Sequence, residues 1–367
     1  MTKRHEPLIR VSKNDSLTWW KGWIVRAIGV LLALVVSGLV IVLLTGYNPI
    51  EVYREMIDGA FGTERKVWIT LQKMAVLLCI SLAVTPAFKM RFWNIGAEGQ
   101  VLAGCLATAA CMIYFGESLP PVILFPVMII ASTVAGAVWS VIPAFFKAKF
   151  GTNETLFTLM MNYVAMQLVS FFVTFWENPK GSNAVGVINS GTQAGWLPPL
   201  FGQKYLINIV LVVILTVGMY IYLRFSKQGY EISVVGESEN TAKYVGINVG
   251  KVIIRTMIVS GALCGVAGLL MVSGTDHTIS ANIVGGMGFT AIMVSWLAKF
   301  NPVVMFLTTF LIVFLQRGAG AIATTFNLNQ SVSDIITGII LFFIIGCEFF
   351  IHYKLNFRTK RKGGQAG

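Results

Sequence analysis

The sequence predicts an all-α polytopic membrane protein with about ten transmembrane helices, some of them broken, that form an inverted repeat. Three observations support this fold class. The 367 residues are 56% apolar and only 12% charged, with a mean hydropathy of +0.74, whereas soluble domains carry about 25% charged residues. Apolar runs long enough to cross a bilayer recur along the whole chain. Two groups of motifs occur twice, about five crossings apart.

Ten apolar runs are expected to cross the membrane. The first follows a polar, basic segment and is not followed by a signal-peptidase site, so it is expected to remain as an anchor. In chain order the runs are 27–46, 67–88, 92–115, 120–146, 152–176, 205–225, 252–273, 283–298, 302–316 and 332–353. An even number of crossings places both termini on the same side of the membrane.

The basic residues set the orientation of these crossings. Most of the 28 Lys and Arg residues lie in segments that this arrangement places on one side, and basic residues collect on cytoplasmic loops. We therefore expect a cytoplasmic N-terminal segment (1–26), a transmembrane domain (27–353) and a basic cytoplasmic tail (354–367). The net charge of +12 follows from this topology, so no nucleic-acid partner is expected.

Two loops are long and polar. The outer loop, 177–204, contains Pro and Trp residues that suit an irregular lid or an interfacial anchor. The inner loop, 226–251, is too polar to insert into the membrane. Its centre predicts a short helix over 238–245, bounded by Gly236 and Gly246.

The stretch 89–104, KMRFWNIGAEGQVLAG, places polar residues and three glycines between two apolar runs. An ionisable side chain near hydrocarbon costs several kcal/mol, so these residues should face protein or water. Glu98 falls in the first turn of the next helix, where its charge suits the helix dipole. Two interpretations remain open, a cytoplasmic turn or a helix break inside the membrane. Small residues predict a helix-packing face formed by Ala97, Gly99, Ala103, Gly104 and Ala107.

A similar polar entry occurs at 151–155, GTNET. Thr152 or Asn153 can cap the helix that follows, and Glu154 can sit on its dipole. Asn162 and Gln167 lie deeper in the same run, where a buried amide needs a partner. A neighbouring helix is favoured over a polar solute as that partner.

The sequence contains no recognisable pattern of catalytic or metal-binding residues. The five Cys residues lie in apolar runs without CxxC spacing, and the three His residues are dispersed, so we expect no metal site, no cofactor and no catalytic residue. The segment 246–252, GINVGKV, departs from a phosphate-binding loop in both glycine spacing and the residue after Lys. This chain is therefore not expected to bind ATP through a phosphate-binding loop.

An internal repeat points to solute transport. GAEGQVLAG…LPPVILF, after the second crossing, resembles GGMGFTAIM…NPVVMFL, after the seventh, and TNETLFTLMMNY resembles SVSDIITGIILF. Units five crossings apart have opposite orientation. Membrane transporters use such inverted repeats, with interrupted helices, to build a pathway near the membrane midplane.

Four motifs carry a family resemblance. FWNIGAEGQ (92–100), GTNETLFTLMMNYVA (151–165), VGESENTAKYVGI (235–247) and GMGFTAIMVSWLAKFNP (286–302) together resemble permeases of ABC importers of the branched-chain amino acid and simple-sugar superfamily, nucleoside-type permeases most of all. The resemblance runs from about residue 48 to 350. It implies a multi-pass subunit of a bacterial inner membrane that is not itself an enzyme. The implied partners are a second homologous permease, a cytoplasmic ATPase that hydrolyses ATP, and an external solute-binding lipoprotein.

The resemblance also assigns residues. It implies that the inner loop is a coupling helix that docks into the ATPase through Gly236, Glu237, Asn240, Ala242, Tyr244, Gly246 and Ile247. Relatives often have Asn-Pro and paired alanines in this loop, where this chain has Glu237, Ser238 and Thr241. The residues expected to line the substrate pathway are Asn94, Glu98, Gln100, Asn153, Glu154, Asn162 and Phe289.

Three functions remain open from the sequence. The first is import of a small polar solute, for which a nucleoside is favoured because amides and aromatic faces suit it. The second is the same machinery importing a simple sugar or riboflavin. The third is an ion-driven secondary transporter, in which Lys73, Glu98, Glu154 or Asp334 would relay the ion.

Overall fold

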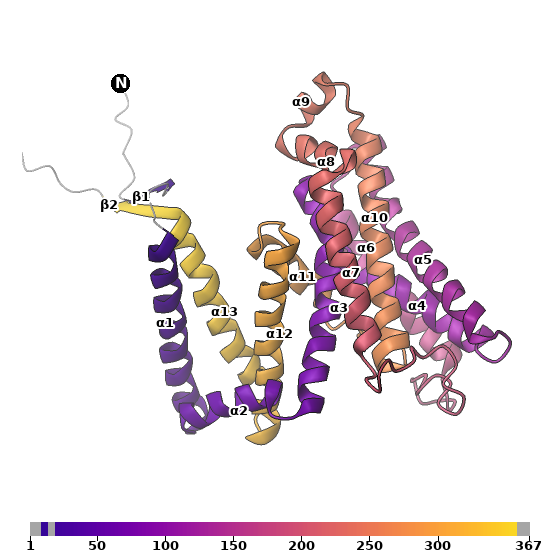
Figure 1. Ribbon diagram of the computed structural model, residues 1–367, viewed down its shortest axis with the longest axis horizontal. Coiled ribbons are helices and arrows are strands. Elements are labelled where there is room, and N and C mark those ends of the chain that lie inside the picture. Colours follow the sequence, from indigo (N-terminus) through magenta and orange to yellow (C-terminus); the bar gives the residue numbers. More distant parts are fainter. Residues whose placement is uncertain (1–8, 14–18, 358–367) are drawn as a thin grey trace, which may run out of the picture. The chain divides into compact units, whose positions relative to one another are not determined.

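The protein is described by a computed structural model that covers residues 9–13 and 19–357, and it is helical apart from one two-stranded ribbon (Figure 1). Within these residues, nine helices are long and apolar enough to cross a membrane, and a shorter apolar helix spans Met287–Leu297. The predicted all-α polytopic fold is confirmed. The chain divides into two compact units, Glu64–Val313 and Met1–Thr63 with Phe314–Gly367.

The larger unit is built around one central helix, α10, which packs against α3, α4 and α5. The elements of this unit, in chain order, are α3 (Glu64–Lys89), α4 (Ala97–Phe115), α5 (Pro121–Phe150), α6 (Glu154–Trp176), α7 (Leu206–Phe225), α8 (Lys227–Glu237), α9 (Glu239–Tyr244), α10 (Val249–Met271), the π-helical turn η1 (Val272–Asp276), α11 (Met287–Leu297) and the start of α12 (Pro302–Thr325).

Small residues let α10 approach its neighbours closely. A Cβ at Gly265 of α10 would lie 2.1 Å from the carbonyl oxygen of Ser132 in α5, and a Cβ at Gly104 of α4 would lie 2.6 Å from Cα of Gly265. Helices in a bilayer associate through this kind of backbone contact, because lipid supplies no hydrophobic drive between them. Gly104 thus lies on a packing face, as the sequence predicted.

The smaller unit joins the two ends of the chain. It contains β1 (Ile9–Lys13), α1 (Trp19–Thr45), α2 (Pro49–Phe61), the end of α12, α13 (Gln330–His352) and β2 (Tyr353–Phe357). Helices α1 and α13 lie side by side (Figure 1). The hydroxyl of Tyr53 in α2 donates to the carbonyl oxygen of Leu34 in α1 at 2.6 Å. The ends of the predicted terminal segments, residues 1–8, 14–18 and 358–367, lie outside the described residues.

The two strands bring the ends of the described chain together. β1 and β2 are antiparallel, with Ile9 opposite Phe357 and Lys13 opposite Tyr353. Among the described residues, nine helices are long enough to cross a membrane, and the predicted crossing 283–298 contains the shorter apolar helix α11.

The outer loop, 177–204, is irregular but anchored to the ends of two helices of its unit. Asn189 donates from Nδ2 to the carbonyl oxygen of Met112 at the end of α4 (2.8 Å), and the backbone N–H of Leu197 donates to the carbonyl oxygen of Ser273 (3.0 Å). The ring of Trp196 stacks on His277, with centroids 3.8 Å apart. Burial lowers the pKa of His277 below its usual 6.5, so this imidazole is held in its neutral form.

Candidate functional site

The candidate site is organised around the break between α3 and α4. Helix α3 ends at Lys89, Arg91 turns the chain with a φ of +60°, and α4 starts only at Ala97. The predicted crossing 92–115 therefore begins five residues later as a helix. The intervening residues Phe92 and Asn94 are buried in the chain, so their backbone groups need partners within the protein.

Asn94 supplies several of these partners. Its Oδ1 accepts from the backbone N–H of Gly96 (3.0 Å) and from Nε2 of Gln100 (3.1 Å), while its Nδ2 lies 3.4 Å from both Oε1 of Gln100 and Oγ of Ser260. Both amides are buried. A buried amide pair that satisfies its own donors and acceptors is rigid, so this pair fixes the start of α4 against the break.

Helix α6 holds the other side of the break. Oδ1 of Asn162 accepts from the N–H of Gly99 (2.8 Å), its Nδ2 donates to the carbonyl oxygen of Ile95 (2.9 Å), and Oγ1 of Thr158 accepts from the N–H of Ile95 (3.2 Å). The amide of Asn162 thus bonds to a neighbouring segment, the interpretation that the sequence favoured.

Asn162 reaches the break from inside α6. α6 begins at Glu154, whose carboxylate pairs with Lys147 at 2.8 Å. Asn162 lies two turns further along this helix, about 12 Å at 1.5 Å per residue. Its bonds to Gly99 and Ile95 therefore hold the break along the first two turns of α6.

Glu98 joins this break to a second one. Its Oε1 accepts from the backbone N–H of Gly286 and its Oε2 from that of Gly288, both at 2.8 Å. These N–H groups belong to the first turn of α11, so the carboxylate lies where the N-termini of α4 and α11 meet. Both helix dipoles stabilise a negative charge there. We call this arrangement the Glu98 clasp.

The clasp leaves no room for other atoms. Glu98 is only 2% exposed, and a Cβ at Gly288 would lie 2.5 Å from the backbone nitrogen of Glu98. Gly286 has a φ of +78°, which only glycine adopts without strain. Gly288 is therefore required by the close approach of the two helices, and Gly286 by its backbone conformation.

An exposed aromatic surface lies on the two segments that the clasp joins, the break and α11. The indoles of Trp93 and Trp296 are stacked with centroids 5.7 Å apart and an interplanar angle of 27°, and each is 47% exposed. Phe289 and Met293 are also exposed, and their spacing with Trp296 puts all three on one face of α11. Phe289 was predicted from the sequence as a pathway residue, whereas Trp93 and Trp296 were not. Trp296 could have been predicted, because residues 289, 293 and 296 share one face of a helix.

Asn153 and Glu154 lie at the start of α6 and serve that helix end. Oδ1 of Asn153 accepts from the N–H groups of Thr155 (3.0 Å) and Leu156 (3.2 Å), so it caps the helix as the sequence predicted. Glu154 pairs with Lys147 of α5. The structure thus gathers Asn94, Glu98, Gln100 and Asn162 around the break and gives these two residues separate partners.

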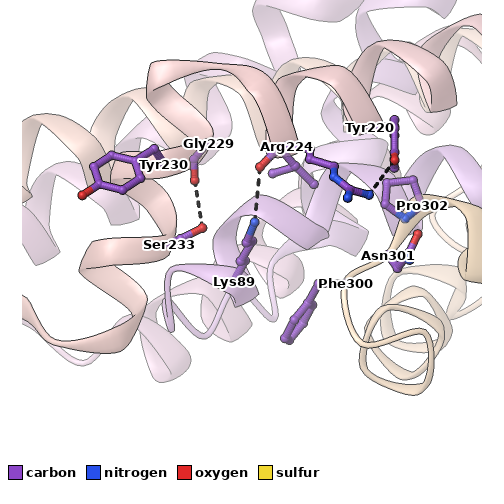
Figure 2. Close-up of a pocket in the computed structure, with 10 residues that line it drawn as sticks. Lys89, Tyr220, Arg224, Gly229, Tyr230, Ser233, Phe300, Asn301 and Pro302 are labelled. Atoms are coloured by element: carbon purple, nitrogen blue, oxygen red, sulfur yellow. Dashed lines mark hydrogen bonds between the residues drawn. The ribbon is translucent and has the colours of Figure 1, made fainter.

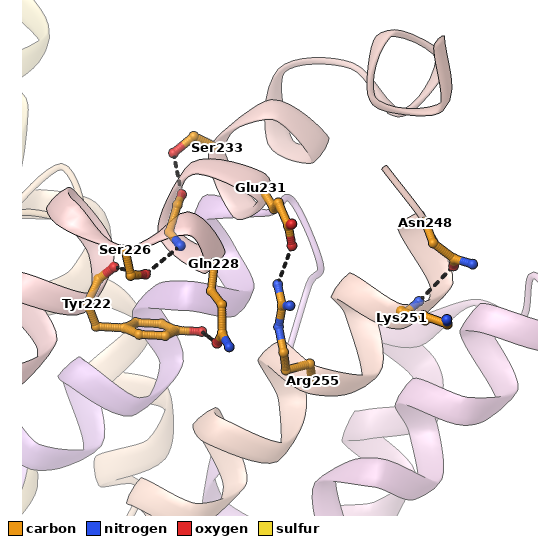
Figure 3. Close-up of polar contacts among 9 residues, drawn as sticks. Tyr222, Ser226, Gln228, Glu231, Ser233, Asn248, Lys251 and Arg255 are labelled. Atoms are coloured by element: carbon orange, nitrogen blue, oxygen red, sulfur yellow. Dashed lines mark hydrogen bonds and ion pairs between the residues drawn. The ribbon is translucent and has the colours of Figure 1, made fainter. Parts of the chain in front are cut away.

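The inner loop forms two short helices at one end of the larger unit (Figures 1 and 3). Oγ of Ser226 accepts from the N–H of Gly229 at 2.9 Å and starts α8, and Oγ of Ser238 accepts from the N–H of Thr241 at 3.2 Å and starts α9. Helix α9, Glu239–Tyr244, confirms the short helix predicted over 238–245. We call α8 and α9 together the coupling segment.

The coupling segment packs directly on the break. Ala242 of α9 and Val235 of α8 belong to one buried cluster with Met90 and Phe92. Nη2 of Arg255 in α10 pairs with Glu231 in α8 at 2.6 Å (Figure 3).

The opposite face of α9 points outward, where Tyr244 is 96% exposed. The segment therefore joins an exposed tip to the residues that precede Asn94. Of the residues assigned to coupling, Gly236 and Ala242 are buried, Ile247 is half-buried, and the exposed ones are Glu237, Asn240, Tyr244 and Gly246.

Comparison with known protein families identifies this architecture. The family described as "Branched-chain amino acid transport system / permease component" matches residues 68–345. The chain belongs to this permease family. It is a multi-pass membrane protein and the permease subunit of an ABC importer, and such a permease works with an ATPase and other transporter components. This membership decides against the ion-driven alternative.

Three curated relatives resemble the chain over most of its length. A glucose ABC transporter permease of Haloferax volcanii is 28% identical, with 98% of this chain and 96% of the relative covered. A nucleoside ABC transporter permease of Lactococcus lactis is 28% identical, with 90% and 94% covered. A guanosine ABC transporter permease of Bacillus subtilis is also 28% identical, with 93% and 97% covered.

Proposed function

We propose that this permease imports a nucleoside. The observation that carries the proposal is the exposed indole pair Trp93–Trp296, which joins the break to α11. A nucleobase stacks on aromatic side chains with about 1–3 kcal/mol per base. Two of the three relatives are named for nucleoside or guanosine transport, which supports the same substrate class.

The two carboxylates among the predicted pathway residues already have partners, which suits a neutral solute. The carboxylate of Glu98 is fully engaged by two backbone N–H groups, and Glu154 is neutralised by Lys147. Asn94 directly follows Trp93 in the chain. We therefore assign the pathway residues two roles: Phe289 and the indoles contact the solute, while the remaining members hold that surface in place, namely Asn94, Glu98, Gln100, Asn153, Glu154 and Asn162.

The partners proposed for this subunit follow from its two ends. The coupling segment and the outer loop extend from opposite ends of the larger unit (Figure 1). We place the coupling segment and both termini in the cytoplasm, against an ATPase, and the loop 177–204 outside, facing a solute-binding lipoprotein. A second homologous permease completes the pathway in a bacterial cell membrane. The domain division 1–26, 27–353 and 354–367 belongs to the same proposal.

Transport proceeds by alternating access in this proposal. ATP-driven closure of the ATPase displaces α9, and the close-packed cluster with Met90 and Phe92 passes that displacement to the break. The break and α11 move together because Glu98 holds them. The indole surface then opens first to one side of the membrane and afterwards to the other.

Uptake by proteoliposomes containing the assembled transporter tests the substrate. Replacing Trp296 with Ala is expected to raise the half-saturating concentration of guanosine about 5- to 150-fold, because about 1–3 kcal/mol of stacking is lost. W296F should retain most of the affinity. The control is W20A, because Trp20 is an exposed indole of α1 in the other unit.

A competition experiment separates the alternatives. Unlabelled guanosine or adenosine should suppress uptake, whereas glucose and riboflavin should not. The glucose permease among the relatives makes a sugar the second candidate. Suppression by glucose alone, or equal uptake by W296A and wild type, would overturn the nucleoside assignment.

A further inference from the structure

A cavity of about 370 Å³ lies where three predicted membrane spans end (Figure 2). Lys89 is the last residue of α3, Arg224 is next to last in α7, and Pro302 is the first residue of α12. The remaining wall comes from α8, through Tyr230 and Ser233. The cavity adjoins the indole surface through Phe300, whose ring centroid lies 5.1 Å from that of Trp296, but neither indole lines it. Its volume falls within the range of about 300–1,000 Å³ that ligand sites occupy.

The cavity carries two positive charges without a counter-charge. Nζ of Lys89 donates to the carbonyl oxygen of Leu223 at 3.3 Å, and Nη1 of Arg224 donates to the hydroxyl of Tyr220 at 2.7 Å (Figure 2). Every residue that lines the cavity is basic, polar uncharged or apolar. Within the part of the chain that the structure describes, both cations have only neutral partners.

Both cations keep unused hydrogen-bond donors. A Lys ammonium has three donors and an Arg guanidinium has five, and each spends one on the protein. Tyr230, which is 63% exposed, and Asn301 add further polar groups to the lining. Lys and Arg side chains that line one cavity can together recognise the oxygen atoms of a phosphate group.

The position of the cavity selects the source of the phosphate. The cavity lies at the ends of three helices that are long and apolar enough to cross a membrane, and basic pockets between transmembrane helices on the cytoplasmic side bind anionic headgroups. Leu223 and Phe300 give the cavity an apolar wall, and the exposed ring of Phe225 follows Arg224. An apolar wall beside paired cations fits a phospholipid, whose acyl chains and phosphate need both.

We propose that this cavity binds the phosphate group of an anionic phospholipid. The bound lipid bridges the end of α3, the bend between α7 and α8, and the turn between α11 and α12. These are neighbours of the coupling segment, so the lipid fixes the surface on which α8 rests.

Native mass spectrometry of the purified full-length chain with phosphatidylglycerol tests the proposal. The double variant K89Q/R224Q is expected to weaken binding about 30-fold, from about fivefold for each cation lost near an anionic surface. The charge-matched control is K243Q/K251Q, which removes two exposed lysines of the same loop region outside the cavity and should bind as wild type does. Phosphatidylcholine should bind weakly to all three proteins.

Three outcomes would overturn the proposal. The first is equal binding of phosphatidylglycerol by K89Q/R224Q and wild type. The second is displacement of the lipid by millimolar inorganic phosphate, which would identify a soluble anion as the ligand. The third is loss of the lipid when the ATPase is added, which would identify an acidic surface of that partner. If K89Q/R224Q fails to fold, K89R/R224K keeps both charges and should retain binding, and its failure to bind would contradict the proposal equally.

Discussion

Replacing Glu98 with Gln tests the clasp with the smallest possible change. The amide keeps the size of the carboxylate but has one acceptor oxygen and one NH2 donor. One of the two N–H groups of α11, at Gly286 or Gly288, then faces another donor. Because Glu98 is 2% exposed, water does not replace the lost acceptor.

The expected cost follows from this geometry. A hydrogen bond to a charged group contributes about 1.5–3 kcal/mol, and a negative charge at a helix N-terminus adds about 0.3–1 kcal/mol. Part of this free energy is recovered in E98Q, because burying a neutral amide costs less than burying a charge. A net loss of about 2–3 kcal/mol lowers the melting temperature of a unit of this size by about 5–10 °C.

A thiol-reactive dye that fluoresces on reaction supplies the assay. All four Cys residues of the larger unit, Cys79, Cys105, Cys111 and Cys264, are free and buried, so they react only when the protein opens. E154Q is the matched control, because Glu154 also lies in the first turn of a helix but forms a partly exposed ion pair with Lys147. Such a pair contributes about 0.2–1 kcal/mol, or a shift of at most about 4 °C.

The difference in melting temperature between E98Q and E154Q decides whether the clasp stabilises the protein. If E98Q melts no lower than E154Q, then α11 is held by other contacts and the clasp does not stabilise the site. The two N–H bonds to Glu98 would then contribute nothing measurable to stability.

The remaining predictions concern the coupling segment and the outer loop. G236A should lower the melting temperature, because its Cβ would lie 2.1 Å from the carbonyl oxygen of Lys89 and such overpacking costs about 1–3 kcal/mol. The control G218A has open space around the new Cβ and should melt as wild type does. Equal melting temperatures for the two variants would contradict the close contact at Gly236. Y244A should reduce ATP-driven uptake in proteoliposomes while the melting temperature is unchanged, because its side chain is 96% exposed; wild-type uptake would remove Tyr244 from the coupling surface. H277F should keep a ring against Trp196 and flatten the dependence of melting temperature on pH. Burial lowers the pKa of His277 below 6.5, so the unfolded chain binds a proton more readily than the folded chain. Stability that is present above pH 6.5 is therefore lost as the pH falls below 6.5. If the melting temperatures of H277F and wild type change equally with pH, His277 is not the group responsible.

The sequence predicts the crossings well because hydropathy and length determine them. It misplaces the start of α4 because Phe92 and Trp93 are apolar, and hydropathy does not register a turn within an apolar stretch. The turn depends on Arg91 at positive φ and on bonds from Asn162, which lies in another helix. Local pattern is sufficient for the cap of α6, where Asn153 bonds to residues two and three positions away.

The candidate site is less predictable because its contacts are distant in sequence. Glu98 was recognised as a first-turn residue suited to the dipole of its own helix, yet its partners are the N–H groups of α11, at Gly286 and Gly288. The stacked pair Trp93–Trp296 joins the same two regions. The repeated glycine-rich motifs indicated that both regions are interrupted helices. They did not indicate that the two interruptions bind each other.

In the alternating-access proposal, the contacts of the break link the ATPase to the indole surface. Ala242 and Val235 of the coupling segment share a buried cluster with Met90 and Phe92, and Trp93 is the next residue along the chain. Protein interiors are close-packed and deform little, so the proposal expects a displacement of α9 to reach the indole of Trp93 through this cluster. The two N–H bonds to Glu98 would pass the same displacement to α11. A single flexible link in this series would absorb the motion, so the proposal depends on the buried hydrogen bonds around the break.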